Sequence, residues 1–159
     1  MICKSVEKLY NMNPTLIQLL LADDDADDRM FFKEALDELP VHSSLRTVDD
    51  GDQLMKLLTN ESTILPDILF LDLNMPRKSG FECLTEIKTN EKLKSLKVII
   101  YSTSFDPGMV NSLYENGAHL YVCKPGDFNN LKKVIHEAIK TATQGNSLQT
   151  SKEYFVIQI

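Results

Sequence analysis

The chain has 159 residues, of which 43% are hydrophobic and 25% charged, and its formal net charge is −6. This length and composition predict a single globular domain with a short extension, and the acidic balance argues against nucleic acid as a direct ligand. Three widely spaced cysteines without a CxxC motif, the lack of a signal-peptide segment and the shortness of the apolar runs predict a cytoplasmic protein without disulfides, zinc or membrane contact.

The first half of the chain alternates between apolar runs and amphipathic stretches. Residues 16–22 form a short, almost continuous apolar run, which is typical of a strand buried on both faces of a parallel sheet. Residues 28–39 carry apolar side chains at helical spacing and stop before Pro40, so they predict a helix. A more exposed strand is expected at 43–48, followed by a short helix at 52–59.

The second half repeats this alternation of strand and helix. The predicted strands cover residues 67–71, 98–101 and 120–123, and the predicted helices cover 79–90, 107–116 and 127–142. Ser79 is a suitable N-cap for the first of these helices, and Gly117 a suitable terminator of the second. Strand–helix units repeated in this way indicate an α/β protein with the flavodoxin-like doubly wound fold, a five-stranded parallel sheet in the order 2-1-3-4-5.

Polar side chains stand at the carboxyl ends of the predicted strands, which meet at one edge of such a sheet. They are Asp23 and Asp24 after the first strand, Asp72 after the third, Ser102 after the fourth and Lys124 after the fifth. Converging carboxylates repel one another and need a cation, and oxygen ligands without a nearby His or Cys suit Mg²⁺. The three carboxylates, one Mg²⁺ and one ammonium sum to zero charge.

This charge balance favours phosphoryl transfer. A carboxylate can act as a nucleophile and form an acyl phosphate. The phosphoryl oxygens then need Mg²⁺, a cation such as Lys124 and a hydroxyl donor such as Ser102. Each residue alone is explained as well by a cap, a turn or a solvated side chain, so the hypothesis depends on their combination.

Together these residues resemble the receiver domains of two-component response regulators, of the stand-alone chemotaxis type. The matching segments are residues 19–24 (LLLADD), 67–76 (DILFLDLNMP), 79–80 (SG), Ser102 and 121–125 (YVCKP). The match predicts a receiver domain at 16–142, preceded by a leader at 1–15 and followed by a linker and β-prone tail at 143–159.

The resemblance implies a metal site and a phosphoacceptor. Asp72 corresponds to the phosphoacceptor of the family. Asp24, Asp72 and the backbone carbonyl of Asn74 correspond to direct ligands of Mg²⁺, for which Mn²⁺ can substitute, and Asp23 corresponds to a ligand that acts through water.

The resemblance also implies a phosphoryl-binding group and a switch. Lys124 corresponds to the lysine that contacts the phosphoryl oxygens, Ser102 to the switch hydroxyl and Tyr121 to the switch aromatic. The peptide bond between Lys124 and Pro125 corresponds to a cis bond.

By the same resemblance, a sensor histidine kinase or a histidine phosphotransfer protein supplies the phosphoryl group. The output is contact with an unknown protein target, through the surface around Tyr121 and the fourth and fifth helices. We expect a monomer or a phosphorylation-dependent homodimer that catalyses only its own phosphorylation and dephosphorylation.

Two alternatives remain open at the level of sequence. A pseudo-receiver would keep the fold as a protein-binding module, although the complete residue set argues against it. An Mg²⁺-dependent phosphatase with an aspartyl nucleophile needs an acid two residues after that nucleophile, where this chain has Asn74.

Two segments outside the motif, one acidic and one apolar, lead to further predictions. Asp25, Asp27 and Asp28 are best explained as capping and favourable charge at a helix N-terminus, and the competing hypothesis is that Asp25 or Arg77 tunes the phosphoryl lifetime from the rim. The apolar tail at 153–159 is expected to dock on its own domain or on that of a neighbour.

Overall fold

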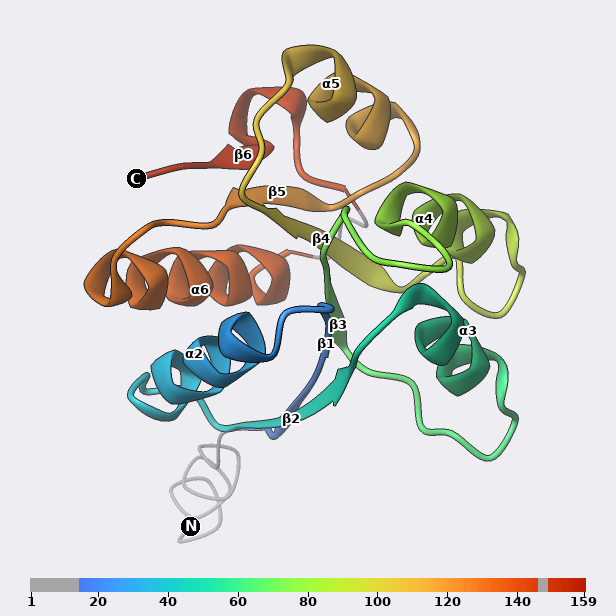
Figure 1. Ribbon diagram of the computed structural model, residues 1–159, viewed down its shortest axis with the longest axis horizontal. Helices are drawn as coiled ribbons and strands as arrows, with labels where there is room; N and C mark the ends of the chain where they lie inside the picture. Colours follow the sequence, from blue (N-terminus) through green and yellow to red (C-terminus); the bar gives the residue numbers. More distant parts are fainter. Residues whose placement is uncertain (1–14, 146–148) are drawn as a thin grey trace, which may run out of the picture.

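A six-stranded parallel sheet forms the centre of the molecule (Figure 1). The computed structural model describes residues 15–145 and 149–159. The strands are β1 (Ile17–Ala22), β2 (Ser43–Val48), β3 (Ile68–Leu71), β4 (Lys97–Ser102), β5 (Leu120–Cys123) and β6 (Val156–Ile157). Their order is β2-β1-β3-β4-β5-β6, and every neighbouring pair is parallel. The predicted fold and the order of the first five strands are therefore confirmed.

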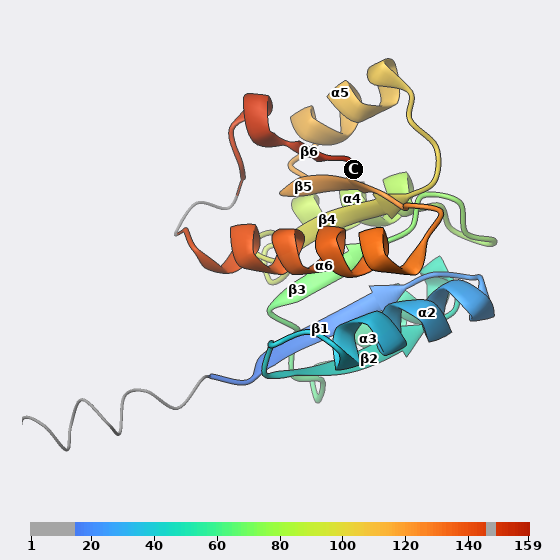
Figure 2. The ribbon, with the colours of Figure 1, turned by 90° about the vertical axis from the view of Figure 1, so that its left-hand side faces the viewer.

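Helices cover both faces of this sheet, as right-handed crossovers between parallel strands require (Figures 1 and 2). One face carries α2 (Ala26–Asp37) and α6 (Phe128–Thr143). The other carries α3 (Gly51–Thr59), α4 (Gly80–Thr89) and α5 (Pro107–Glu115). None of these helices is long and apolar enough to cross a bilayer, in the part of the chain that the structure describes.

Each central strand sends alternate side chains into two separate cores. Leu20 and Leu69 pack with the helices α3, α4 and α5, whereas Leu19 and Phe70 pack with α2 and α6. These strands are buried on both faces, which explains why the sequence shows continuous apolar runs instead of alternation.

Side-chain caps decide where the helices begin. Asp25 accepts hydrogen bonds from the backbone N–H groups of Asp27 and Asp28, so α2 begins at Ala26, two residues before the predicted start. Ser79 caps α4 in a capping box with Glu82, as the sequence at its N-terminus predicted. The capping interpretation of Asp25 is therefore confirmed.

The C-terminal tail, which was predicted to be β-prone, adds a sixth strand to the predicted five-stranded sheet. After the short 3₁₀ helix η1 (Lys152–Tyr154), Phe155 is buried at 2% exposure, and its ring packs edge-on against Tyr114 of α5 at 5.1 Å between centroids. The Tyr121 N–H donates to the Phe155 carbonyl at 2.8 Å, so the tail extends the sheet at β5. The tail thus docks on its own domain, while most of the predicted leader, residues 1–14, lies outside the described residues.

Candidate functional site at the carboxyl edge of the sheet

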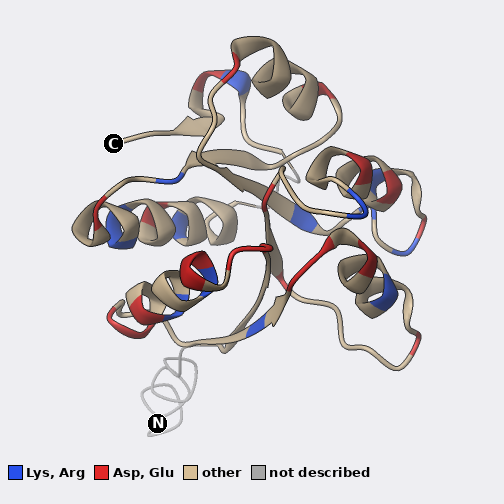
Figure 3. Cartoon of the chain, in the orientation of Figure 1, with Lys and Arg blue, Asp and Glu red and all other residues tan. Residues whose placement is uncertain are grey.

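The polar strand-end residues meet at one edge of the sheet because backbone pairing continues beyond the strands. The Asp72 N–H donates to the carbonyl of Ala22 at 2.9 Å, and the Lys124 N–H donates to that of Ser102 at 2.8 Å. These bonds hold Asp72 beside the end of β1 and Lys124 beside the end of β4, the strand that lies between β3 and β5. Figure 3 shows acidic segments at the ends of β1, β2 and β3.

Asp23, Asp24 and Asp72 form a carboxylate cluster at this edge. Each offers an oxygen, and these oxygens lie within 4.8 Å of one another. Asp23 and Asp72 are buried, at 0% and 6% exposure, while Asp24 is exposed. Oxygens on opposite sides of an octahedral Mg²⁺ are about 4.2 Å apart, so small side-chain adjustments let one ion contact the cluster.

Lys124 supplies positive charge to the same cluster. Its Nζ lies 2.7 Å from Asp23 Oδ2 and 3.7 Å from Asp72 Oδ2, and its side chain is only 7% exposed. The ammonium also sits 4.8 Å from the ring centroid of Tyr101, which is held edge-on by Phe32 and Phe70. The structure therefore brings these acids and this lysine together in one cluster.

The positive charge of Lys124 does not fully offset the cost of burying the Asp23 and Asp72 carboxylates. Burial raises the pKa of Asp72 to about 7, Lys124 opposes that rise, and the charges of Asp23 and Asp24 add to it. Burial also raises the pKa of Asp23, against the hydrogen bond from Lys124. A divalent cation among these oxygens would restore both groups to the charged form, so the residues present fit such an ion.

Gly80 lets helix α4 begin directly against the backbone of Asp72. A Cβ at this position would lie 2.2 Å from the Asp72 carbonyl oxygen, and the Gly80 N–H donates to the Leu73 carbonyl at 2.9 Å. The Asn74 N–H lies 3.4 Å from Asp72 Oδ1, and Asn74 itself is exposed. The turn after β3 thus holds the Asp72 backbone against Gly80 and the Asp72 side chain near the Asn74 N–H. The role of the Asn74 carbonyl as a metal ligand stays a prediction.

Ser102 and Tyr121 lie beside one another behind the pocket. Ser102 is fully buried, and its hydroxyl lies 3.2 Å from that of Ser104. The Tyr121 hydroxyl donates to the Ser104 carbonyl, and its ring meets Phe105 edge-on at 6.2 Å. Both residues therefore contact the loop between β4 and α5, and their role as a switch stays a prediction.

The prediction of a cis peptide bond between Lys124 and Pro125 is wrong for this structure. No peptide bond between described residues is cis. The trans form is favoured by about 0.5–1 kcal/mol at X–Pro bonds. Lys124 reaches Asp23 and the neighbourhood of Asp72 with this bond trans.

Sequence reasoning missed Asp28 as a member of the pocket. Its Oδ2 lies 2.9 Å from Lys124 Nζ, although the residue was interpreted as favourable charge at a helix end. The available signal was its place in the first turn of the helix that follows Asp23, from which a side chain returns toward the strand end. Arg77, at φ 69°, pairs with Asp50 at 3.5 Å and does not reach the cluster.

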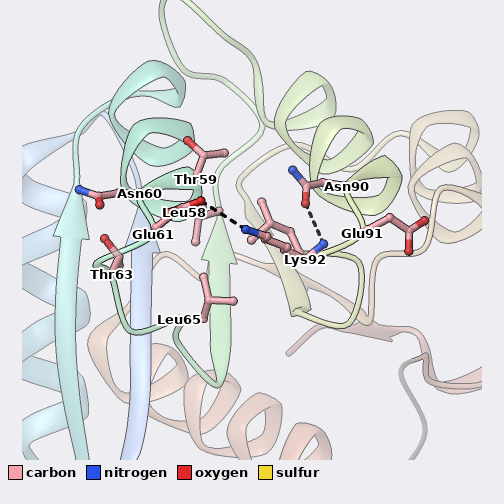
Figure 4. A pocket seen from close by; sticks show the side chains of 10 residues that line it. Leu58, Thr59, Asn60, Glu61, Thr63, Leu65, Asn90, Glu91 and Lys92 are labelled. Carbon is pink, nitrogen blue, oxygen red and sulfur yellow. Dashed lines mark hydrogen bonds and ion pairs between the residues drawn. The ribbon is translucent and has the colours of Figure 1, made fainter.

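An open groove lies at the opposite edge of the sheet, between the C-terminal ends of α3 and α4 (Figure 4). Leu58, Leu65 and Leu93 contribute its apolar lining. An ion pair of 3.6 Å between Lys92 and Glu61 crosses it, with side chains 79% and 89% exposed. These charges are solvated, so the groove lacks the buried polar groups that mark the carboxyl edge.

Known proteins are similar to this chain in sequence. The family model of the response regulator receiver domain matches residues 19–136. The response regulator Rcp1 of Synechocystis sp. is 33% identical over 127 residues, which cover 77% of this chain and 86% of Rcp1. The chemotaxis protein CheY of Listeria monocytogenes is 26% identical over 125 residues, which cover 79% of this chain and 100% of CheY.

Solved structures are similar to this chain in fold. The Mn²⁺-bound form of response regulator Rcp1 has a TM-score of 0.74 at 28% identity, covering 84% of this chain and 99% of that one. The phosphorylated cyanobacterial phytochrome response regulator RcpA also has a TM-score of 0.74 at 28% identity, covering 84% and 98%. This chain belongs to the response regulator receiver domain family, the signalling domains that receive phosphoryl groups from histidine kinases in two-component systems.

Proposed function

We propose that this receiver accepts a phosphoryl group on Asp72 from a phosphohistidine, in a reaction that depends on Mg²⁺, and then changes its protein contacts. The observation that carries the proposal is the single pocket in which Lys124 lies 3.7 Å from Asp72 and the three acids lie within 4.8 Å. The donor is a sensor histidine kinase or a histidine phosphotransfer protein.

Asp72 is the nucleophile in this proposal. One of its carboxylate oxygens forms a bond to phosphorus as the phosphorus–nitrogen bond to the donor histidine breaks, and the departing imidazole takes up a proton. An anionic carboxylate is required, and the raised pKa of Asp72, which burial causes, makes that state depend on nearby positive charge. Lys124 contributes such charge and an N–H donor for the phosphoryl oxygens.

Asp24, Asp72 and the Asn74 carbonyl would hold the metal directly, and Asp23 would hold it through water. When bound, Mg²⁺, or Mn²⁺ in its place, supplies charge that neutralises the phosphoryl oxygens. The carboxylates fit this role because they are hard oxygen ligands without a thiol or imidazole among them. The similar response regulator Rcp1 has been solved in an Mn²⁺-bound form, which supports the binding of a divalent ion by this chain.

Ser102 and Tyr121 link the pocket to the surface. The Ser102 hydroxyl turns toward the new phosphoryl oxygens, which releases space beside Ser104 and changes the loop that Tyr121 contacts. Tyr121 also pairs with the C-terminal tail through its backbone, so the output surface includes β5, β6 and α5. Another protein binds this output surface, and phosphorylation shifts the population of the receiver toward the state that binds it.

Phosphorylation by a small donor tests the proposal. The protein is incubated with Mg²⁺ and acetyl phosphate, and its intact mass is measured. We expect one phosphoryl adduct on the wild type and none on Asp72→Asn, a nearly isosteric change. An adduct that persists in Asp72→Asn, or continuous release of phosphate from many phosphomonoesters, would refute it.

A further inference from the structure

Lys124 forms its hydrogen bonds with two carboxylates, neither of which is the phosphoacceptor. Its ammonium donates to Asp23 Oδ2 at 2.7 Å and to Asp28 Oδ2 at 2.9 Å. The distance to Asp72 Oδ2 is longer, at 3.7 Å, which is an ion pair beyond hydrogen-bonding range. A lysine has three N–H donors, and two of them are committed to acids other than the phosphoacceptor.

The backbone and the surrounding side chains hold Asp28 in this place. Asp25 accepts a hydrogen bond from the Asp28 N–H at 3.1 Å and so fixes the first turn of α2. Asp28 and Lys124 both line a cavity of about 180 Å³ whose wall includes Tyr101 and Phe31. The ring of Tyr101 lies under the ammonium, so Lys124 is held between the acid cluster and this cavity.

Asp28 changes the charge balance of the pocket. Three carboxylates, a divalent cation and one ammonium would sum to zero, but Asp28 adds a fourth carboxylate in direct contact with that ammonium. Arg29, the next residue, does not compensate, because its guanidinium binds the Asp23 carbonyl and Asp49 instead. An incoming phosphoryl group therefore meets an excess negative charge and a lysine that is already engaged.

We infer that Asp28 is a positioning residue that competes with the phosphoryl group for Lys124 and thereby slows phosphorylation of Asp72. The inference rests on the proposed function. In the resting protein Asp28 holds the ammonium, and when Asp72 gains a phosphoryl group, Lys124 turns its donor from Asp28 to a phosphoryl oxygen. Asp28 acts through Lys124 and contacts none of the reacting atoms.

The rate of phosphorylation by acetyl phosphate at saturating Mg²⁺ tests this inference. Asp28→Asn keeps the shape of the side chain and removes its charge. We expect a rate roughly two- to fivefold above that of the wild type, the range that a partly exposed ion pair supports. Added salt should reduce this gain because the Asp28 side chain is 36% exposed and its charge is screened.

Two further variants separate this role from a structural one. Asp27→Asn, the matched control, removes an exposed acid from the same turn of α2 that does not pair with Lys124 in the described structure, and should leave the rate unchanged. Asp28→Glu restores the charge and should return the rate toward the wild-type value.

The outcomes distinguish this inference from the proposed function. A rate for Asp28→Asn no higher than for Asp27→Asn, or a gain that persists undiminished at high salt, would overturn the role of Asp28 while leaving the phosphoacceptor intact. An absence of any adduct on the wild type would instead overturn the proposed function itself.

Discussion

Replacing Asp72 by Asn should stabilise the metal-free protein, and increasingly so as the pH rises. The folded protein raises the pKa of the Asp72 carboxyl from 3.8 to about 7, mainly by burial. The folded state therefore binds this proton more tightly than the unfolded state, so Asp72 lowers the free energy of unfolding as the pH rises from about 4 to about 7. An asparagine has no such proton and escapes this loss.

The size of the effect follows from the shift. Each pKa unit corresponds to about 1.4 kcal/mol, so the full penalty is about 4 kcal/mol above pH 7. Of this penalty in the free energy of unfolding, roughly 3 kcal/mol develops between about pH 5 and about pH 8. The titrating groups outside this cluster are common to both proteins, so they cancel in the difference between the variant and the wild type.

Urea denaturation with a metal chelator measures this difference. The free energy of unfolding is determined for the wild type and Asp72→Asn at about pH 5 and about pH 8. We expect the stability advantage of Asp72→Asn to grow by roughly 3 kcal/mol over this interval. An advantage that is equal at the two pH values would refute the conclusion that burial raises the pKa of Asp72. Asp27→Asn, at an exposed acid, serves as the control.

Three other perturbations test neighbouring parts of the structure. Added Mg²⁺ should raise the melting temperature of the wild type but much less that of Asp72→Asn, in a thermal scan; equal shifts would count against a site that contains Asp72. Phe155→Ala should lower the free energy of unfolding by about 3–5 kcal/mol because it empties a fully buried site, whereas Tyr154→Ala, at a residue 67% exposed, should change it little; similar values for both would contradict docking of the tail. Ser79→Ala should cost about 1 kcal/mol in the same assay by removing the capping box of α4, and no loss would show that the cap is dispensable.

The strands and the order of the sheet were predictable because burial on both faces leaves a mark in the local sequence. Continuous runs such as residues 68–71 are fully buried, and the structure differs from the predicted strand bounds there by a single residue. The start of α2 was predicted two residues late, because the capping by Asp25 depends on which of several neighbouring acids accepts the backbone N–H groups.

The site was predictable to the extent that it depends on strand ends. In a parallel sheet, the residues that follow the strands lie at the same end of the sheet. Asp23, Asp72 and Lys124 meet there, although β4 separates β3 from β5. Asp28 was missed because it does not follow a strand: it lies in the first turn of α2, and its contact with Lys124 depends on the reach of two side chains. Local periodicity carries no information on such a contact.

The sequence by itself therefore determined the α/β class, the strand order and the acids and lysine that occupy the carboxyl edge, because these depend on which residues are apolar and on where each strand ends. Only the tertiary structure decided that Lys124 donates to Asp28, that its bond to Pro125 is trans and that Phe155 anchors a sixth strand. Those features arise from packing between distant segments, where small differences in side-chain reach and backbone direction select one arrangement among several that the local sequence permits.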